Sequence, residues 1–177
     1  MVALAAWGCV KKDPSPADAE RDRVADLEGD SSKAAELAAI LRDPKQDDLV
    51  RAQAAASLGR MPSGAGYADV LIAALEDPSP VVRRDAAEAA GNHAFPAAAD
   101  PLINRLRLDP AVDVRRAAAV ALGKIRSQGA VPGLIAALED PDPGVQVLVS
   151  ESLEAVTGQK FGRDKEAWDK WAAGQPK

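Results

Sequence analysis

The chain has 177 residues and a formal net charge of −5, and 47% of its residues are hydrophobic. Alanine contributes 38 residues, whereas aromatic residues make up 3%, and there is one Cys and one His. One cysteine excludes an internal disulfide framework, one histidine excludes a His-rich metal site, and the acidic balance disfavours coating of nucleic-acid phosphates. An alanine-rich, aromatic-poor composition indicates thin helices that pack closely against each other.

The first segment, residues 1–16, is a short apolar stretch followed by a polar linker. Its Ala6-Trp7-Gly8-Cys9 resembles the end of a bacterial lipoprotein signal. The resemblance implies that Cys9 is lipidated and holds the protein at a bacterial envelope membrane. The alternative is a frayed N-terminus of a cytoplasmic protein in which Cys9 is incidental, and the bulk of Trp7 and the lack of a basic leader favour it.

Residues 17–48 are expected to form capping helices at the N-terminal end of the fold. Residues 17–27 favour a polar helix, and Ser31 or Ser32 is expected to cap a second helix over residues 33–42. A polar outer face is what the end of a stacked helical array needs, because that face meets water.

Residues 49–158 contain an internal repeat of 31–32 residues. A Val-Arg pair begins at residues 50, 82 and 114, and a glycine stands nine residues after each valine. The repeated glycines are Gly59, Gly91 and Gly123. Asp-Pro pairs begin at Asp43, Asp77, Asp109 and Asp140. Self-similarity at this period is typical of stacked supersecondary units.

Each unit is predicted to form two helices. The first carries an apolar stripe such as Leu71, Ile72 and Leu75, and it ends at Asp-Pro because the residue before proline avoids the α region. The second helix begins at the Val-Arg pair, runs through alanines and ends at the glycine, which we expect to adopt the left-handed C-cap conformation. Neither helix can bury its stripe alone, so stacked pairs must share one core.

The Asp-Pro-x-x-x-Val-Arg turn and the alanine-rich stretch up to the glycine, in residues 77–91 and 109–123, resemble the short bacterial type of HEAT-like repeat that also occurs in phycobilisome lyases. The resemblance implies an all-α, right-handed α-α superhelical solenoid of four to five short helical hairpins. It also implies a ladder of turn residues between stacked repeats. The ladder members are Asp77, Arg83, Asp109 and Arg115, with Asp85 and Asp113 as further partners. An arginine in the first turn of a helix opposes the helix dipole, which independently predicts a carboxylate partner.

Four other arginines are candidates for a contact stripe that binds an acidic protein partner: Arg84, Arg116, Arg105 and Arg107. The alternative is a solvated helix surface. Residues 49–143 carry 10 basic and 11 acidic groups, a balance that provides no electrostatic footprint for nucleic acid.

The last segment, residues 159–177, is predicted to be an aromatic capping helix. From Thr157 to Trp171 the chain resembles the Thr-Gly-Gln-x-Phe-Gly…Trp-x-x-Trp element that closes many bacterial HEAT-like arrays. Asp164 is a predicted N-cap, and Trp168 and Trp171 share one helix face. Together with Phe161 they are expected to cover the open core of the last repeat. A platform for an aromatic ligand is the alternative.

No catalytic, metal-binding or cofactor-binding residue is predicted. His93 has no second histidine, the glycines stand singly, and the paired His-Glu motifs of iron-binding HEAT-like hydroxylases are missing. The sequence therefore predicts a non-enzymatic, monomeric scaffold whose concave surface binds another protein, with no nucleic-acid partner and membrane contact only through a lipid anchor. The alternative, from the family resemblance alone, is a phycobilisome-lyase-like accessory or enzyme-associated subunit that acts on a tetrapyrrole protein.

Overall fold

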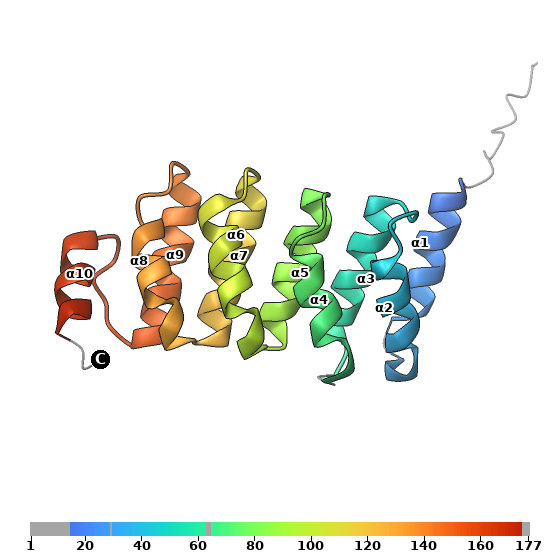
Figure 1. The fold of residues 1–177 in the computed structure, drawn as a ribbon, viewed down its shortest axis with the longest axis horizontal. Coiled ribbons are helices and arrows are strands. Elements are labelled where there is room, and N and C mark those ends of the chain that lie inside the picture. The colour runs from blue at the N-terminus through green and yellow to red at the C-terminus, as the bar shows by residue number, and fades with distance from the viewer. Residues whose placement is uncertain (1–14, 29, 63–64, 175–177) are drawn as a thin grey trace, which may run out of the picture.

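The computed structural model describes residues 15–28, 30–62 and 65–174, and the candidate lipidation residue Cys9 lies outside them. The described residues form ten α-helices and four short 3₁₀ turns, with no strand. The α-helices are α1 (Pro16–Asp26), α2 (Ala34–Arg42), α3 (Asp48–Arg60), α4 (Ala68–Ala74), α5 (Pro80–Asn92), α6 (Ala99–Leu108), α7 (Val112–Ile125), α8 (Val131–Ala137), α9 (Pro143–Thr157) and α10 (Lys165–Ala173). The helices are arranged as antiparallel pairs, and the pairs follow one another in chain order along the long axis (Figure 1).

Eight of these helices form four stacked hairpins in two layers. The helices α2, α4, α6 and α8 make the first-helix layer, and α3, α5, α7 and α9 make the second-helix layer. The terminal helices complete one layer each, because α1 packs against α3 and α10 packs against α8. The prediction of an all-α solenoid of short helical hairpins is confirmed.

The helix boundaries follow local sequence signals. The second helices begin two residues before each repeated valine, and Pro80 and Pro143 stand in the first turn of theirs, where the missing N–H costs nothing. Asp142 caps α9 by accepting a hydrogen bond from the N–H of Val145. The first helix α6 ends just before an Asp-Pro pair, as predicted.

The core is one continuous apolar cluster that runs from Val24 in α1 to Trp168 in α10. The first helices contribute fully buried leucines such as Leu71 and Leu134, and the second helices contribute mostly alanines. Because alanine is short, neighbouring second helices can approach each other closely. The alanine excess of the composition therefore lies where the layers need thin helices.

The repeated glycines lie inside the second helices, so the prediction that they adopt left-handed C-caps is wrong. A Cβ atom built on Gly59 would lie 2.7 Å from the Cβ of Ala89, and one built on Gly91 would lie 2.7 Å from the Cα of Ala121. Such distances leave no room for a side chain. These glycines therefore allow each second helix to touch the backbone of the next one.

Four of the described residues have left-handed backbone. One is Gly162 with φ 57°, and the other three come at intervals of 32 residues. They are Ala94 with φ 49°, Arg126 with φ 56° and Gly158 with φ 75°. Arg126 and Gly158 are the C-caps of α7 and α9. Only the last of the three is a glycine, so two residues with side chains hold a conformation that side chains disfavour.

Replacing Gly91 by alanine is expected to lower the free energy of unfolding by about 1–3 kcal/mol, because the new Cβ meets the backbone of Ala121. At an uncrowded helix position the same change raises stability by up to about 1 kcal/mol, so the sign of the effect tests the contact. Glu154 takes the glycine's place in α9, after which no second helix of the described chain follows. A Glu154→Ala control should therefore shift stability by less than about 0.5 kcal/mol. Urea unfolding followed by circular dichroism measures both, and a Gly91→Ala protein as stable as the wild type contradicts the contact.

Candidate functional site

An arginine in the first turn of each of three second helices ties its repeat to the next one. The Nε and Nη2 atoms of Arg83 donate to the two carboxylate oxygens of Asp109 at 2.7 and 2.8 Å. The Nη1 atom of the same guanidinium donates to the backbone carbonyl of Asp77 at 2.8 Å. This two-point contact fixes the relative position of two neighbouring turns.

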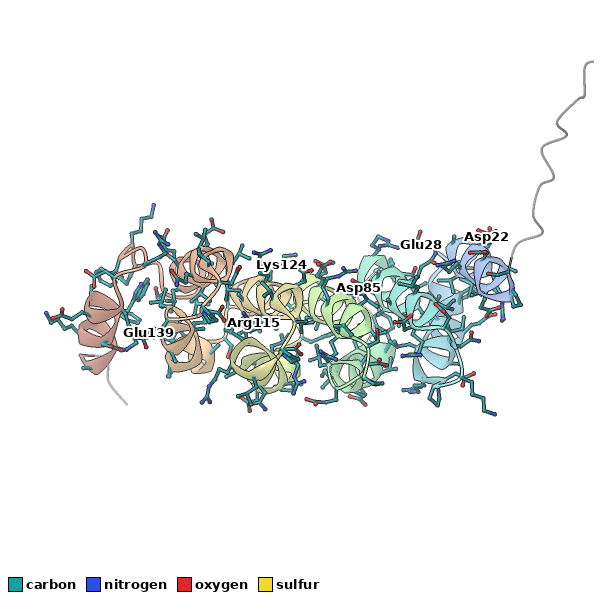
Figure 2. All side chains as sticks on the ribbon, turned by 90° about the horizontal axis from the view of Figure 1, so that it is seen from above. Asp22, Glu28, Asp85, Arg115, Lys124 and Glu139 are labelled. Carbon is teal, nitrogen blue, oxygen red and sulfur yellow. The ribbon has the colours of Figure 1, made fainter. Side chains whose placement is uncertain are left out.

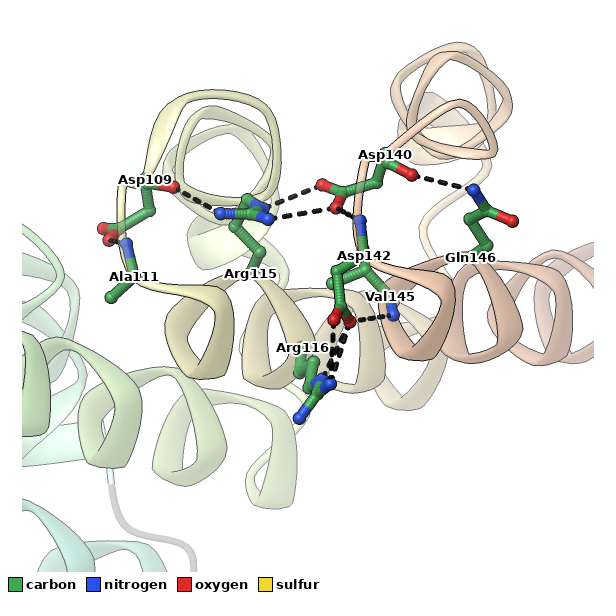
Figure 3. A network of polar contacts seen from close by, with 8 residues as sticks. All are labelled: Asp109, Ala111, Arg115, Arg116, Asp140, Asp142, Val145 and Gln146. Carbon is green, nitrogen blue, oxygen red and sulfur yellow. Dashed lines mark hydrogen bonds and ion pairs between the residues drawn. The ribbon is translucent and has the colours of Figure 1, made fainter.

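The same arrangement occurs one repeat earlier and one repeat later. Arg51 donates to both carboxylate oxygens of Asp77 at 3.2 and 2.9 Å, and Arg115 donates to those of Asp140 at 2.7 and 3.0 Å (Figure 3). Arg51 and Asp140 were missed by the sequence reasoning, although the 32-residue period points to both. In the last repeat Gln146 keeps the bond to the carbonyl of Asp140, at 2.8 Å, in the place of an arginine.

The Asp109 carboxylate is the most enclosed member of this turn ladder, with a side chain that is 0% exposed. Burial by itself would raise its pKa. The hydrogen bonds from Arg83 and from the N–H of Ala111, together with the charges of Arg83 and Arg105, outweigh burial and hold the pKa below its ordinary value. The carboxylate is therefore ionised at neutral pH and depends on its arginine for that.

A groove runs over α5, α7 and α9 in the second-helix layer. It consists of two adjoining hollows of about 580 and 430 Å³, which share Asn92, Val120, Lys124 and Leu148 as lining residues. Gly91 of α5 and Gly123 of α7 line the larger hollow, where α5 meets Ala121 of α7 and α7 meets Ser152 of α9. Lys124 lies on the same side of the array as Asp85 (Figure 2).

Two of the four candidate contact arginines, Arg84 and Arg116, line the smaller hollow. Arg84 forms an ion pair with Asp85 at 2.7 Å, and this contact raises its pKa. Arg116 donates to Asp142 at 2.9 Å and so also holds the N-cap of α9 (Figure 3). Both side chains are half-exposed and fixed in position by carboxylates.

The other two candidate arginines lie on α6 in the first-helix layer, so the four do not share one surface. Arg105 contacts Glu76 at 3.2 Å and Asp109 at 3.6 Å, which places it against the turn ladder. Arg107 makes no ion pair among the described residues and lines a small hollow of about 230 Å³ between α6 and α8.

The C-terminal aromatic residues surround one fully buried ring. Trp168 donates its Nε1–H to the carbonyl of Gly162 at 2.8 Å, and Phe161 and Trp171 meet it edge-on with ring centroids 4.9 and 5.9 Å away. Asp164 accepts a hydrogen bond from the N–H of Ala167, which confirms it as the N-cap of α10. Because the Trp168 ring is fully buried, a ligand cannot stack on it.

A second aromatic cluster lies at the junction between the first two complete hairpins, and the sequence reasoning missed it. Tyr67 meets His93 edge-on at 5.4 Å, and His93 stacks on Phe95 at 5.1 Å. The Nε2–H of His93 donates to the carbonyl of Leu58 at 2.8 Å. Ile125 stands one 32-residue period after His93 and packs against the core. The repeat therefore indicates that His93 is a packing position at the end of α5.

No group of three or more His, Cys, Asp or Glu side chains in residues 15–28, 30–62 and 65–174 is arranged to hold a metal ion. No helix in the same residues is long and apolar enough to cross a membrane.

Comparisons with known proteins agree with this architecture. A family model for HEAT repeats matches residues 34–111 and 99–167. The complex of CpcE and CpcF of phycocyanin lyase from Nostoc sp. PCC7120 is similar with a TM-score of 0.66 and 19% identity, over 99% of this chain and 77% of that chain. Human deoxyhypusine hydroxylase in complex with glycerol is similar with a TM-score of 0.64 and 22% identity, over 75% of this chain.

The matched part is 46% of the hydroxylase chain, so this protein spans about half of that enzyme's length. A search of curated proteins finds no match. At these levels of identity both structural likenesses concern the fold alone.

Proposed function

The chain belongs to the HEAT-repeat family, and we propose that it is a non-catalytic scaffold that binds another protein through the groove on its second-helix layer. The observation that carries this proposal is the groove itself. It crosses three successive second helices, and Val120 and Leu148 give it an apolar lining next to charged residues. An apolar centre with a polar rim is the usual composition of a protein interface.

In this proposal Arg84 and Arg116 belong to the rim of the binding surface. Their carboxylate partners hold both guanidinium groups in place before any partner binds. A side chain that is already ordered loses less conformational entropy on binding than a free one. Each guanidinium also has further N–H donors for a partner's oxygen atoms.

The groove can be tested by filling it. Ala155 is exposed and lines the larger hollow, whereas Ala39 is exposed on α2 in the first-helix layer. We expect an Ala155→Trp protein to lose the partner that the wild type captures from its native host, and an Ala39→Trp protein to retain it. Circular dichroism checks that both variants fold. If Ala155→Trp captures the same partner as the wild type, binding through this groove is wrong.

Membrane attachment is a separate part of the proposal and rests on Ala6-Trp7-Gly8-Cys9. Lipidation of Cys9 would place the scaffold at a bacterial envelope membrane through its acyl chains. Intact-mass spectrometry of the protein from its native host tests this. The expected product begins at an acylated Cys9, and a chain that still carries Met1 and an unmodified Cys9 contradicts it.

An accessory role on a tetrapyrrole protein is the second candidate function. It is supported by the likeness to the phycocyanin lyase complex, which extends over 99% of this chain. Mixing the protein with an apo-phycobiliprotein and its bilin tests the role by absorbance. Faster appearance of the attached-bilin spectrum is expected under this candidate, and an unchanged rate contradicts it.

A further inference from the structure

We infer that the groove binds an acidic segment of its partner and that Lys124 and Arg126, at the end of α7, bind the carboxylates of that segment. This inference rests on the proposed scaffold function and adds the chemistry of the partner. Both residues are exposed and both line the larger hollow.

Neither of these two cations has a carboxylate partner among the residues that the structure describes. Lys124 donates to the neutral side-chain oxygen of Asn92 at 2.8 Å, and Arg126 makes no side-chain hydrogen bond or ion pair within the described chain. The groove's other arginines, Arg84 and Arg116, each contact an aspartate. In a chain with a net charge of −5, two unpaired cations at one lip of a groove favour an anionic ligand.

The backbone of Arg126 adds a second observation. Its φ of 56° lies in the left-handed region, which every residue with a Cβ disfavours. The equivalent residues are Ala94 one repeat earlier, with φ 49°, and Gly158 one repeat later, with φ 75°. The conformation therefore belongs to the repeat, and Arg126 is the one of the three equivalent residues that places a charged side chain there, at the larger hollow.

The other residues that line the larger hollow determine which further side chains the bound acidic segment must carry. Val120, Leu148 and Ala155 require apolar side chains beside the acidic ones. Glu151 is the one acidic residue that lines the larger hollow, and it lies on α9, opposite the cations of α7. Over the larger hollow, the acidic side chains of the segment must therefore face the end of α7 and its neutral side chains must face α9, because Glu88 and Asp113 line the smaller hollow.

Variants at two positions isolate the charge of Arg126. Arg126→Gly removes the cation while it relieves the left-handed strain, so the melting temperature should stay the same or rise. Arg126→Lys keeps the charge. Arg107→Gln is the control, because it removes an exposed cation from α6 in the first-helix layer, outside the groove.

The experiment selects binders for the immobilised full chain from a random peptide library and measures the affinity of a selected peptide by fluorescence anisotropy. We expect the selected peptides to be enriched in Asp and Glu beside aliphatic residues. Arg126→Gly should weaken binding by roughly tenfold or more. Arg107→Gln should leave affinity unchanged, and Arg126→Lys should keep it within about threefold of the wild type.

Neutral or basic peptides, or an Arg126→Gly protein that binds as tightly as the wild type, would overturn the inference. If those peptides still lose binding in Ala155→Trp, the groove remains the binding surface and only the acidic preference is wrong. Peptides that bind Ala155→Trp as well as the wild type contradict the groove and the acidic preference together. A library that yields no binder also overturns the inference, and the capture experiment with Ala155→Trp then decides the scaffold function by itself.

Discussion

Replacing Arg83 by methionine is expected to lower the free energy of unfolding by about 3 kcal/mol, because the change leaves the Asp109 carboxylate buried without its main partner. Methionine keeps much of the length of the arginine side chain, so the lost charge and hydrogen bonds dominate the effect. Urea unfolding at neutral pH measures it. Arg107→Met is the matched control, because Arg107 makes no ion pair among the described residues and should tolerate the change within about 0.5 kcal/mol.

The pH dependence of this variant separates charge from packing. In the wild type the pKa of Asp109 is lowered, so its contribution to stability is complete above the unfolded-state value of about 3.9 and is lost as the pH falls through and below that value. Without Arg83, burial raises the pKa of the carboxyl, and protonation then relieves the buried charge. The deficit of Arg83→Met should therefore shrink between pH 7 and pH 4. A deficit that is constant with pH would mean that packing and not charge causes it.

Replacing Trp168 by alanine is expected to weaken the docking of α10 by about 3–5 kcal/mol, because the ring is fully buried and bonded to the carbonyl of Gly162. The loss should be local, since α10 contacts the array mainly through α8. Hydrogen exchange should show α10 losing protection, α8 losing part of it, and α3 and α5 remaining unchanged.

The neighbouring tryptophan provides the comparison. Trp171 meets Trp168 edge-on and is half-exposed, so Trp171→Ala should cost clearly less than Trp168→Ala. If the two variants lose the same protection, the buried ring does not anchor α10. If protection falls evenly over the whole chain, the array unfolds as one unit and the end is not separately docked.

The repeat and its helices follow directly from the sequence, because periodic apolar stripes and Asp-Pro stops are local signals. The role of the repeated glycines does not follow from the sequence, because glycine is typical both of a helix end and of a close contact between two helices. The difference lies in a partner about 30 residues away: Gly59 faces Ala89, and Gly91 faces Ala121. Which residue faces which is set by the stacking of whole repeats, and one helix alone does not reveal it.

The turn ladder could likewise be predicted only in part from the sequence. The sequence marks Asp77 and Arg83 as residues of one turn, and the carbonyl of that aspartate does accept a bond from Arg83. The carboxylate of Asp77 instead binds Arg51 of the preceding repeat. The groove and its unpaired cations were also beyond local reasoning, because Lys124, Arg126 and Leu148 come together only when α7 and α9 stack.

Site-specific photo-crosslinking in the native host decides whether a partner occupies the groove of the second-helix layer. A photoreactive amino acid is placed at Glu151, which lines the larger hollow, and in a second protein at Ala39 in the first-helix layer. We expect the Glu151 position to crosslink to an acidic segment of one other protein and the Ala39 position not to crosslink to it. Crosslinks to that protein from Ala39 and none from Glu151 would contradict this expectation.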